Sequence, residues 1–445
     1  MPQIILALVL LVSLAAPVGA ATYYVSPAGN DTAACQPDAA GASARKSLTG
    51  GLACLRSGDQ LVVQAGTYSE APIRSIPSGG GTETTRTVVR CETPLACAVT
   101  GQIRLVNRTT HWITIEGFRF TSPGGVTLAL NTTDTVFPST NFPHHIRLSN
   151  FDVAGSPLYC LYTGHGEAIE LINVTVHGCK EQGVYWLARN SSWIGGELYD
   201  IRTSGQQGIT MHTSGGMRPS GNRIEGIFFH DIVGSAIEFA NTEWNVVTRN
   251  IFARIGFSAV RAGANVGAVS HTDIDHNTIV GGSFGVNLEH PASTGNRLRN
   301  NLILGASIPL RFCAGCGTPA GNVLTGTPAE HFVAPLQDDY RLLATSSAVD
   351  AGIDLGRPFT GLAPDAGVFE LAPAPPPPDP VPSPPAPPVP VPPPSRFGIT
   401  ERTERSIVIT GTRADCPGGI TNSSKTTKDA ADNWLDKTVT VTCHE

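Results

Sequence analysis

The sequence is poor in charge: only 15% of its 445 residues are Asp, Glu, Lys or Arg, against roughly 25% in an average soluble protein. This scarcity excludes a charge-rich coiled coil, and a hydrophobic content of 41% excludes a wholly disordered chain. The net charge is −6, and the sequence contains no basic stripe that could bind phosphates, so we expect no nucleic-acid partner. Beyond the first 21 residues, no apolar run reaches the length of a transmembrane helix.

Residues 1–20 predict a secretory signal peptide. The stretch from Ile4 to Leu14 is apolar but too short to span a bilayer, and Pro17 and small residues follow it up to Ala20. We therefore expect a secreted or cell-surface protein, extracellular or periplasmic, without a membrane span.

The ten cysteines fall in couples that are near one another in sequence, which favours disulfides in an exported chain. We predict five bonds: Cys35–Cys54, Cys91–Cys97, Cys160–Cys179, Cys313–Cys316 and Cys416–Cys443. Cys313-Ala-Gly-Cys316 has the spacing of a redox motif, but no thioredoxin-like pattern surrounds it, so we interpret it as a loop staple.

A repeat runs from about residue 110 to residue 312, where alternating strands end in Asn or Gly. The expected corner residues are Gly117, Asn150, Asn173, Gly196, Gly226, Asn250, Asn277 and Asn301. Most spacings lie near 24 residues, which indicates a solenoid. Asn and Gly suit a corner with left-handed backbone, and Asn side chains can also stack in a ladder from coil to coil.

A further strand in each coil places its apolar residues inward, because successive side chains alternate faces. The expected inward residues are Val126, Leu158, Val184, Ile209, Ile237, Val260 and Val286. The first outward position holds Thr127, Tyr159, Tyr185, Thr210, Glu238, Arg261 and Asn287. The second holds Ala129, Leu161, Leu187, His212, Ala240, Gly263 and Glu289.

The repeat, the opening Tyr23-Tyr24-Val25-Ser26-Pro27 and the later Ala348-Val349-Asp350-Ala351-Gly352 resemble the right-handed parallel β-helix proteins of the polysaccharide-lyase-like (pectin-lyase-like) superfamily. The resemblance covers about residues 22–371. It implies an all-β fold, a right-handed parallel β-helix solenoid, while the chemistry must be argued from the site.

The chain beyond the solenoid changes in composition, because 15 of its 35 prolines lie between Pro373 and Pro394. We expect an extended linker there, followed by a small C-terminal β module. The predicted layout is signal peptide 1–20, cap and first coils 21–108, central repeats 109–335, end of the β-helix 336–371, Pro-rich linker 372–395, and disulfide-stapled module 396–445.

The two outward positions bring several chemically active side chains to one face. We predict catalytic roles for Tyr185, His212, Glu238 and Arg261, because acid–base groups and a cation would converge within a few coils. Small residues at Ala240 and Gly263 would leave a groove. The expected substrate-binding residues are Tyr159, Lys180, Asn287 and Glu289.

Two chemistries fit this face. A lyase on a uronic-acid polymer needs a base, an acid and a cation, with Tyr185 or His212 as base or acid and Arg261 as stabiliser. A glycoside hydrolase would use Glu238 and Glu289, two coils and roughly 9–10 Å apart. The resemblance implies a Lys base and Ca²⁺ in some lyases. Ca²⁺ therefore stays a candidate cofactor here, although no Asp cluster marks a site.

We accordingly expect a secreted, monomeric protein that binds a polysaccharide and cleaves it, with lyase chemistry ahead of hydrolysis. A different class stays open at this point: a non-catalytic β-helix that binds glycan or serves as a surface adhesion protein. An ordinary solvated face, in which Glu238 and Arg261 form only a neighbouring-coil ion pair, is the plainer interpretation of the same residues.

Overall fold

The computed structural model describes residues 19–70, 82–126, 128–262 and 266–371, together with two strands at 420–428 and 434–443. The expected signal peptide, except for its last two positions, and the Pro-rich linker lie outside the described residues. The chain forms two compact units, Met1–Pro375 and Pro376–Glu445. Within the described part of the chain, none of the helices combines the length and the apolar character needed to cross a membrane.

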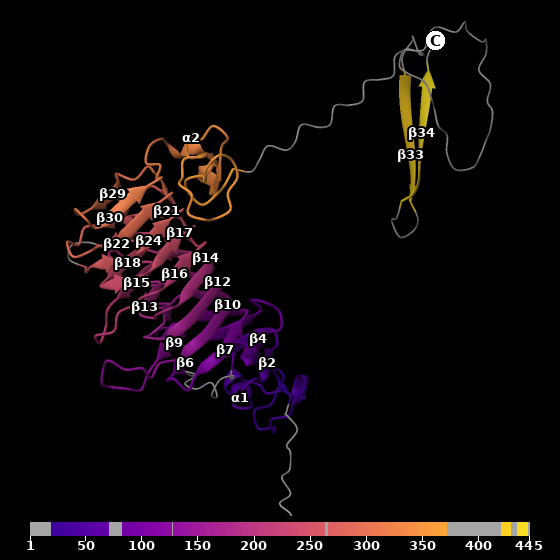
Figure 1. Cartoon of the computed structure of the whole chain (residues 1–445). Helices are drawn as coiled ribbons and strands as arrows, with labels where there is room; N and C mark the ends of the chain where they lie inside the picture. Colours follow the sequence, from indigo (N-terminus) through magenta and orange to yellow (C-terminus); the bar gives the residue numbers. More distant parts are fainter. Residues whose placement is uncertain are drawn as a thin grey trace, which may run out of the picture. The chain divides into compact units, whose positions relative to one another are not determined.

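The larger unit is a right-handed parallel β-helix whose coils stack from β2 to β30 (Figure 1). Each complete coil contributes strands to three faces. Face 1 is a nine-stranded sheet of β6 (Ile103–Val106), β9 (Leu128–Asn131), β11 (Leu161–Tyr162), β13 (Val184–Trp186), β15 (Ile209–His212), β18 (Ile237–Ala240), β22 (Ser258–Ala262), β26 (Phe284–Leu288) and β29 (Ile308–Phe312).

Faces 2 and 3 belong to one 19-stranded sheet, because three long strands continue around the corner between them. These shared strands are β10 (His144–Ala154), β12 (Glu167–His177) and β14 (Ser192–Ile201). Face 2 also contains β1 (Thr22–Val25), β2 (Gln60–Val63), β4 (Thr87–Cys91), β7 (His111–Glu116), β16 (Arg223–Glu225), β20 (Val246–Thr248), β24 (Asp273–Asp275), β27 (Asn296–Arg299) and β30 (Gly317–Ala320). Face 3 adds β3 (Gly66–Ser69), β5 (Cys97–Thr100), β8 (Phe118–Thr121), β17 (Phe228–Ile232), β21 (Ile251–Ile255), β25 (Thr278–Val280) and β28 (Leu302–Leu304).

Short elements complete the described chain. They are η1 (Gly41–Ser43), α1 (Leu48–Leu52), η2 (Glu83–Thr85), β19 (Thr242–Glu243), β23 (Val269–Ser270), α2 (Pro328–His331), β31 (Phe332–Ala334), η3 (Pro335–Gln337), β32 (Asp339–Leu342), β33 (Ile420–Lys428) and β34 (Trp434–Cys443). We call the turn from face 1 to face 2 the first corner, and the turn from face 2 to face 3 the second corner.

The core lies inside the coils and follows the predicted inward column from β13 onward. Val184, Ile209, Ile237, Val260 and Val286 are each 0% exposed and stand in register on successive coils. This part of the prediction is confirmed. Full burial of such a side chain contributes about 1.5–3 kcal/mol, so the column stabilises the whole stack of coils.

The first two members of that predicted column are wrong. Leu158 is 39% exposed, and Leu161 pairs with Val184 in its place. Leu128 pairs with Leu161 and is fully buried, whereas Val126 lies in the turn before the strand and is only half-buried. The turn before β11 is thus longer than the alternation suggested, and a shift by an odd number of residues reverses which side chains face inward.

The second corner uses left-handed backbone, as predicted, in its early coils. Gly117, Asn150, Asn173 and Gly226 all have positive φ. In later coils the left-handed residue is one position earlier than predicted, at Arg249, His276 and Asn300. Asn250, Asn277 and Asn301 instead follow the left-handed residue and lie immediately before β21, β25 and β28, with their side chains buried.

These buried asparagines form the expected ladder. Asn250 Nδ2 donates to Asn277 Oδ1 at 3.1 Å, and Asn277 Nδ2 donates to Asn301 Oδ1 at 2.9 Å. Asn301 Nδ2 continues to Asn322 Oδ1 at 2.9 Å. Asn250, Asn277 and Asn301 are 0% exposed, so each bond satisfies a polar group that water does not reach.

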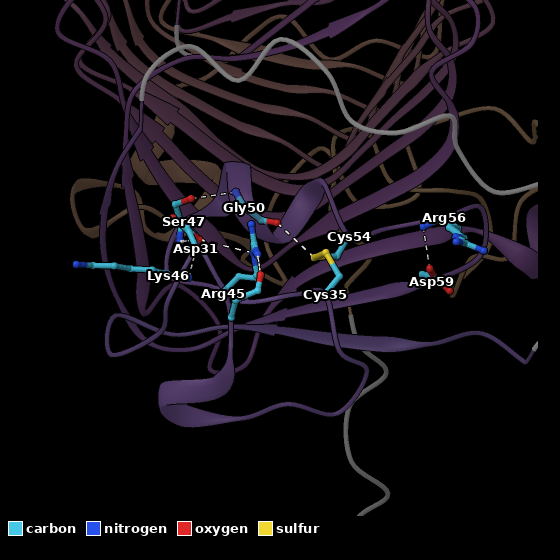
Figure 2. Close-up of a disulfide and its surroundings, with 10 residues drawn as sticks. Asp31, Cys35, Arg45, Lys46, Ser47, Gly50, Cys54, Arg56 and Asp59 are labelled. Carbon is cyan, nitrogen blue, oxygen red and sulfur yellow. Dashed lines mark hydrogen bonds and ion pairs between the residues drawn. A yellow bond between two sulfur atoms is a disulfide. The ribbon is translucent and has the colours of Figure 1, made fainter.

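The N-terminal end is closed by a cap that contains α1 and the Cys35–Cys54 disulfide (Figure 2). Asp31 accepts hydrogen bonds from the backbone N–H groups of Lys46 and Ser47, and the Ser47 hydroxyl caps α1 by accepting from Gly50 N at 2.9 Å. Burial alone would raise the pKa of Asp31, but these hydrogen bonds outweigh it and lower the pKa.

Four of the five predicted disulfides are present: Cys35–Cys54, Cys91–Cys97, Cys160–Cys179 and Cys313–Cys316. Cys313-Ala-Gly-Cys316 therefore staples a loop beyond β29. The fifth stays a prediction, because Cys416 lies outside the described residues. Its partner Cys443 ends β34, which pairs antiparallel with β33 from Cys443↔Ile420 to Trp434↔Lys428.

Candidate functional site

The candidate site lies on face 1, where hydrogen-bonded register sets the order of the outward side chains. Tyr185 pairs with Thr210, Thr210 with Glu238, Glu238 with Arg261, and Arg261 with Asn287. The structure therefore brings together the predicted first outward column over five coils. Tyr162, not Tyr159, precedes Tyr185 in this column.

Three tyrosine rings nevertheless gather at the start of the column. Tyr159 reaches from the turn before β11 and stacks on Tyr185 at 4.9 Å between ring centroids, and Tyr162 lies 5.7 Å from Tyr185. Burial raises the pKa of Tyr185 to about 12 and also raises that of Tyr162, so both phenols stay protonated at neutral pH.

Tyr185 and His212 form a direct hydrogen bond between the phenol oxygen and Nε2. Their rings meet edge to face with centroids 4.9 Å apart. Burial lowers the pKa of His212, so the imidazole is neutral at pH 7 and its Nε2 accepts from the tyrosine hydroxyl. The pair thus holds a proton donor and a proton acceptor side by side.

Glu238 and Arg261 form an ion pair on the next two coils. Arg261 Nη1 donates to Glu238 Oε2 at 2.9 Å, and the guanidinium lies 5.0 Å from the centre of the Phe257 ring. The Glu238 side chain is 16% exposed. Burial raises the pKa of Glu238, and the Arg261 charge opposes this rise only in part.

Three buried polar atoms in the same column make no hydrogen bond to any residue that the structure describes. They are Thr210 Oγ1, Arg261 Nε and Asn287 Oδ1. Buried polar groups are nearly always satisfied, so each exception needs an explanation. A hollow of about 280 Å³ adjoins Arg261 and is lined by Phe257 and Ser235, whose hydroxyl also lacks a partner within the described chain.

The predicted substrate-binding residues occupy different settings. Asn287 is only 2% exposed, because it stands between Arg261 and Arg311 in the column. Glu289 is paired with Arg311 at 2.5 Å. Lys180 is exposed in the turn before β13. Gly263 lies outside the described residues, so the groove expected beside Ala240 stays a prediction.

Sequence reasoning missed Tyr162 and Arg311 as members of this surface. Leu161-Tyr162 has the same inward–outward alternation as Leu158-Tyr159, the pair predicted from the sequence to lie in the column. Leu310-Arg311 continues the alternation one coil further. The alternation in the sequence was therefore sufficient to predict Arg311 as a member of the column. Choosing Tyr162 over Tyr159 required the register between coils.

Calcium finds no suitable set of ligands in the described chain. Among the residues with described positions, no group of three or more His, Cys, Asp or Glu could hold a metal ion. The acidic residues of face 1 are instead engaged with arginines. The residues present therefore do not fit a calcium site.

His165 lies in Gly164-His165-Gly166, near the site, and is a buried residue of the fold. It is 5% exposed and packs against Phe142 with ring centroids 5.1 Å apart. Burial, with Arg189 and His212 nearby, lowers the pKa of His165 to about 4. The folded protein therefore resists protonating this imidazole in mildly acidic solution.

We expect folding stability to fall as the pH decreases from about 6.5 toward 4, because the unfolded chain binds a proton at His165 in that window and the folded chain does not. The loss from this residue is on the order of 3 kcal/mol. Chemical denaturation of His165→Phe and wild type across this range measures it. An equal pH slope in both proteins would contradict the expectation.

Comparison with known proteins agrees with this architecture. Residues 159–321 match the sequence model of a family described as the right handed beta helix region. The protein has the right-handed parallel β-helix fold. No curated protein matches its sequence.

Solved structures with the same β-helix include the pectate lyase Pel9A, at 13% identity and a TM-score of 0.50, covering 79% of this chain and 96% of that one. The A-module of the Azotobacter vinelandii mannuronan C-5 epimerase AlgE4 matches at 11% identity with a TM-score of 0.45. The match covers 61% of this chain and 87% of that chain. A rhamnogalacturonan lyase matches at 12% identity with a TM-score of 0.42, and the match covers 70% of this chain and 90% of that chain. At 13% identity, the similarity to Pel9A shows the fold alone.

Proposed function

We propose that this β-helix protein is exported and cleaves an acidic polysaccharide by β-elimination on face 1. The observation that carries the proposal is the placement of the Tyr185–His212 pair beside the Glu238–Arg261 pair on neighbouring coils. Export is supported by four disulfides, which persist in oxidising compartments.

The protonation states of the first pair assign the acid and the base. Burial keeps Tyr185 protonated and His212 neutral, so their pKa values are pushed apart in the directions that acid–base catalysis needs. Tyr185 is the proton donor, and His212 is the proton acceptor. Each acts in the state that it already holds at neutral pH.

The elimination then proceeds as follows. The glycosidic oxygen of the substrate replaces His212 as acceptor of the Tyr185 hydroxyl, and His212 Nε2 takes the proton alpha to the uronate carboxylate. The released electron pair forms the carbon–carbon double bond as the glycosidic bond breaks, and the leaving oxygen takes the Tyr185 proton. The imidazolium returns its proton to the phenolate, which restores both residues.

Arg261 stabilises the negative charge that develops on the substrate carboxylate during proton removal. Glu238 uses one terminal nitrogen of the guanidinium, which leaves Arg261 Nε without a described partner. Glu238 thus orients the arginine, and the guanidinium, whose side chain is 26% exposed, attracts an anion by its charge.

The test is digestion of polygalacturonate, alginate and uncharged xylan by the purified protein. We expect new ultraviolet absorbance from an unsaturated uronate on a charged polymer and none on xylan, since only a uronate has an acidic proton beside a carboxylate. Reducing ends without that absorbance, or retention of polymer without any cleavage, would overturn the elimination proposal.

One observation favours glycoside hydrolysis as a second candidate. The raised pKa of Glu238 suits a general acid, and Glu289 lies two coils away along the same face. Two coils correspond to roughly 9–10 Å between strands, and Glu289 lies two residues beyond Asn287, so the carboxyl groups stand at or beyond the upper end of the inverting range. Reducing ends without unsaturated product, lost in Glu238→Gln, would identify this reaction.

A further inference from the structure

The first corner contains a column of residues that all adopt left-handed backbone. Each is joined to the next coil by backbone pairing at or beside its own position. In chain order, these residues are Trp112, His145, Ala168, Asn190, Gly221, Trp244, His271 and Gly295. The geometry is a property of the corner, since eight successive coils share it regardless of side chain.

Trp244 is an unfavourable residue for this corner. Left-handed backbone costs an L-residue such as tryptophan roughly 1–2 kcal/mol, whereas glycine accepts it freely, as Gly221 and Gly295 do. Burial in the core does not compensate for the cost, because Trp244 is 59% exposed. A strained and exposed tryptophan points to a role outside folding.

One face of the Trp244 ring is supported and the opposite face lies toward a position without a side chain. His271 of the next coil stacks on the indole with centroids 4.2 Å apart and planes 11° apart. On the preceding coil the corner residue is Gly221. The indole is therefore held flat against His271, and Gly221 presents no side chain of its own to the opposite face.

A second aromatic stack lies further along the same corner. Trp112 and His145 have ring centroids 3.9 Å apart, and Arg86 lies 5.1 Å from the centre of the Trp112 ring. Between the two stacks are only Ala168, Asn190 and Gly221. Four coil steps separate His145 from Trp244, or roughly 19 Å at the usual spacing between strands.

The polar groups at this position suit a ligand that carries hydroxyls. The Asn190 side chain lies over Gly221, because a Cβ on that glycine would be 2.5 Å from Asn190 Oδ1. Glu243, the residue before Trp244, is paired with Arg218 at 2.9 Å. A sugar ring presents an apolar C–H face to an aromatic plane and hydroxyls at its edge, which matches an indole flanked by amide and charged groups.

We propose that Trp244, supported by His271, is a glycan-binding subsite that stacks one sugar ring on the indole face opposite His271, with the Asn190 amide at the edge of the ring. It takes its ligand class from the proposed function but needs no cleavage. Trp244 follows the end of β18 by four residues, and β18 carries Glu238. A polymer held at Trp244 is thereby anchored close to face 1 without occupying the reacting position.

The test compares binding in native gels that contain polygalacturonate, alginate or xylan. We expect at least one polymer to retard the wild type, and Trp244→Ala to weaken that retardation at least tenfold in apparent affinity. Gly221→Asn should weaken it similarly, because asparagine tolerates left-handed backbone, adds a side chain beside the indole and displaces the Asn190 amide. Ile194→Ala, at a 42% exposed apolar residue of the second corner, should bind like the wild type.

Thermal unfolding of Trp244→Ala should be close to that of the wild type, so that lost binding reports the subsite. Retention of tight binding by both Trp244→Ala and Gly221→Asn, or no retardation of the wild type by any of the three polymers, would overturn the proposal. Binding that depends on Trp244 without any cleavage would leave the subsite standing and reject the lyase. Cleavage of a uronate polymer together with unchanged binding in both variants would support the lyase and reject the subsite.

Discussion

Arg261→Ala is expected to lower kcat/KM on the uronate polymer by roughly 10²–10³-fold, the usual effect of removing one group that stabilises a developing oxyanion. The arginine is the cation of the face 1 column that is paired with Glu238, and its Nε has no described partner. The measurement is the initial rate of unsaturated-product formation. Arg261→Lys should recover only part of the rate, because lysine retains the charge but not the planar donor pair.

Folding must be separated from catalysis in that experiment, because Arg261→Ala leaves Glu238 half-buried without its cation. Arg297→Ala is a matched control, since Arg297 is paired with Asp273 across neighbouring coils of face 2 at 2.5 Å. We expect this control to retain wild-type activity. Activity of Arg261→Ala within a few-fold of the wild type would remove Arg261 from the reaction.

Asn277→Leu is expected to destabilise the fold by several kcal/mol. Asn277 Oδ1 accepts from both Asn250 N and Asn250 Nδ2, and its own Nδ2 donates to Val247 O and Asn301 Oδ1. The change deprives several fully buried polar groups of partners, and each such group costs about 1–3 kcal/mol. Chemical denaturation monitored by circular dichroism measures the loss.

The matched control for this ladder is Asn173→Gly at the same corner. Asn173 Nδ2 donates to Asn150 Oδ1 at 3.3 Å, but this bond is exposed, and glycine keeps the left-handed backbone available. Its cost should stay below about 1 kcal/mol, because water replaces the lost bond. An equal decrease in the free energy of unfolding in the two variants would show that the buried ladder contributes no more to stability than the exposed bond.

The sequence by itself was sufficient for the architecture, because its signals are local. Alternation of apolar residues distinguishes inside from outside along one strand, and Asn and Gly mark the second corner. Closeness in sequence predicted four cysteine pairs, and the alternation predicted the neighbouring-coil placement of Glu238 and Arg261. In these coils, strand and turn lengths vary little, so residue spacing in the sequence predicts which residues are neighbours on adjacent coils.

The tertiary structure alone decided the register where turns change length, and the first corner as a whole. Tyr162 replaces Tyr159 in the column because hydrogen bonds between coils, and not alternation, select the pairing of β11 with β13. The first corner holds Trp, His, Ala, Asn and Gly at one backbone conformation, so no shared residue type marks it in the sequence. Its exposed Trp244 becomes visible only when coils distant in sequence are stacked, because the stacking places Gly221 and His271 on either side of the ring.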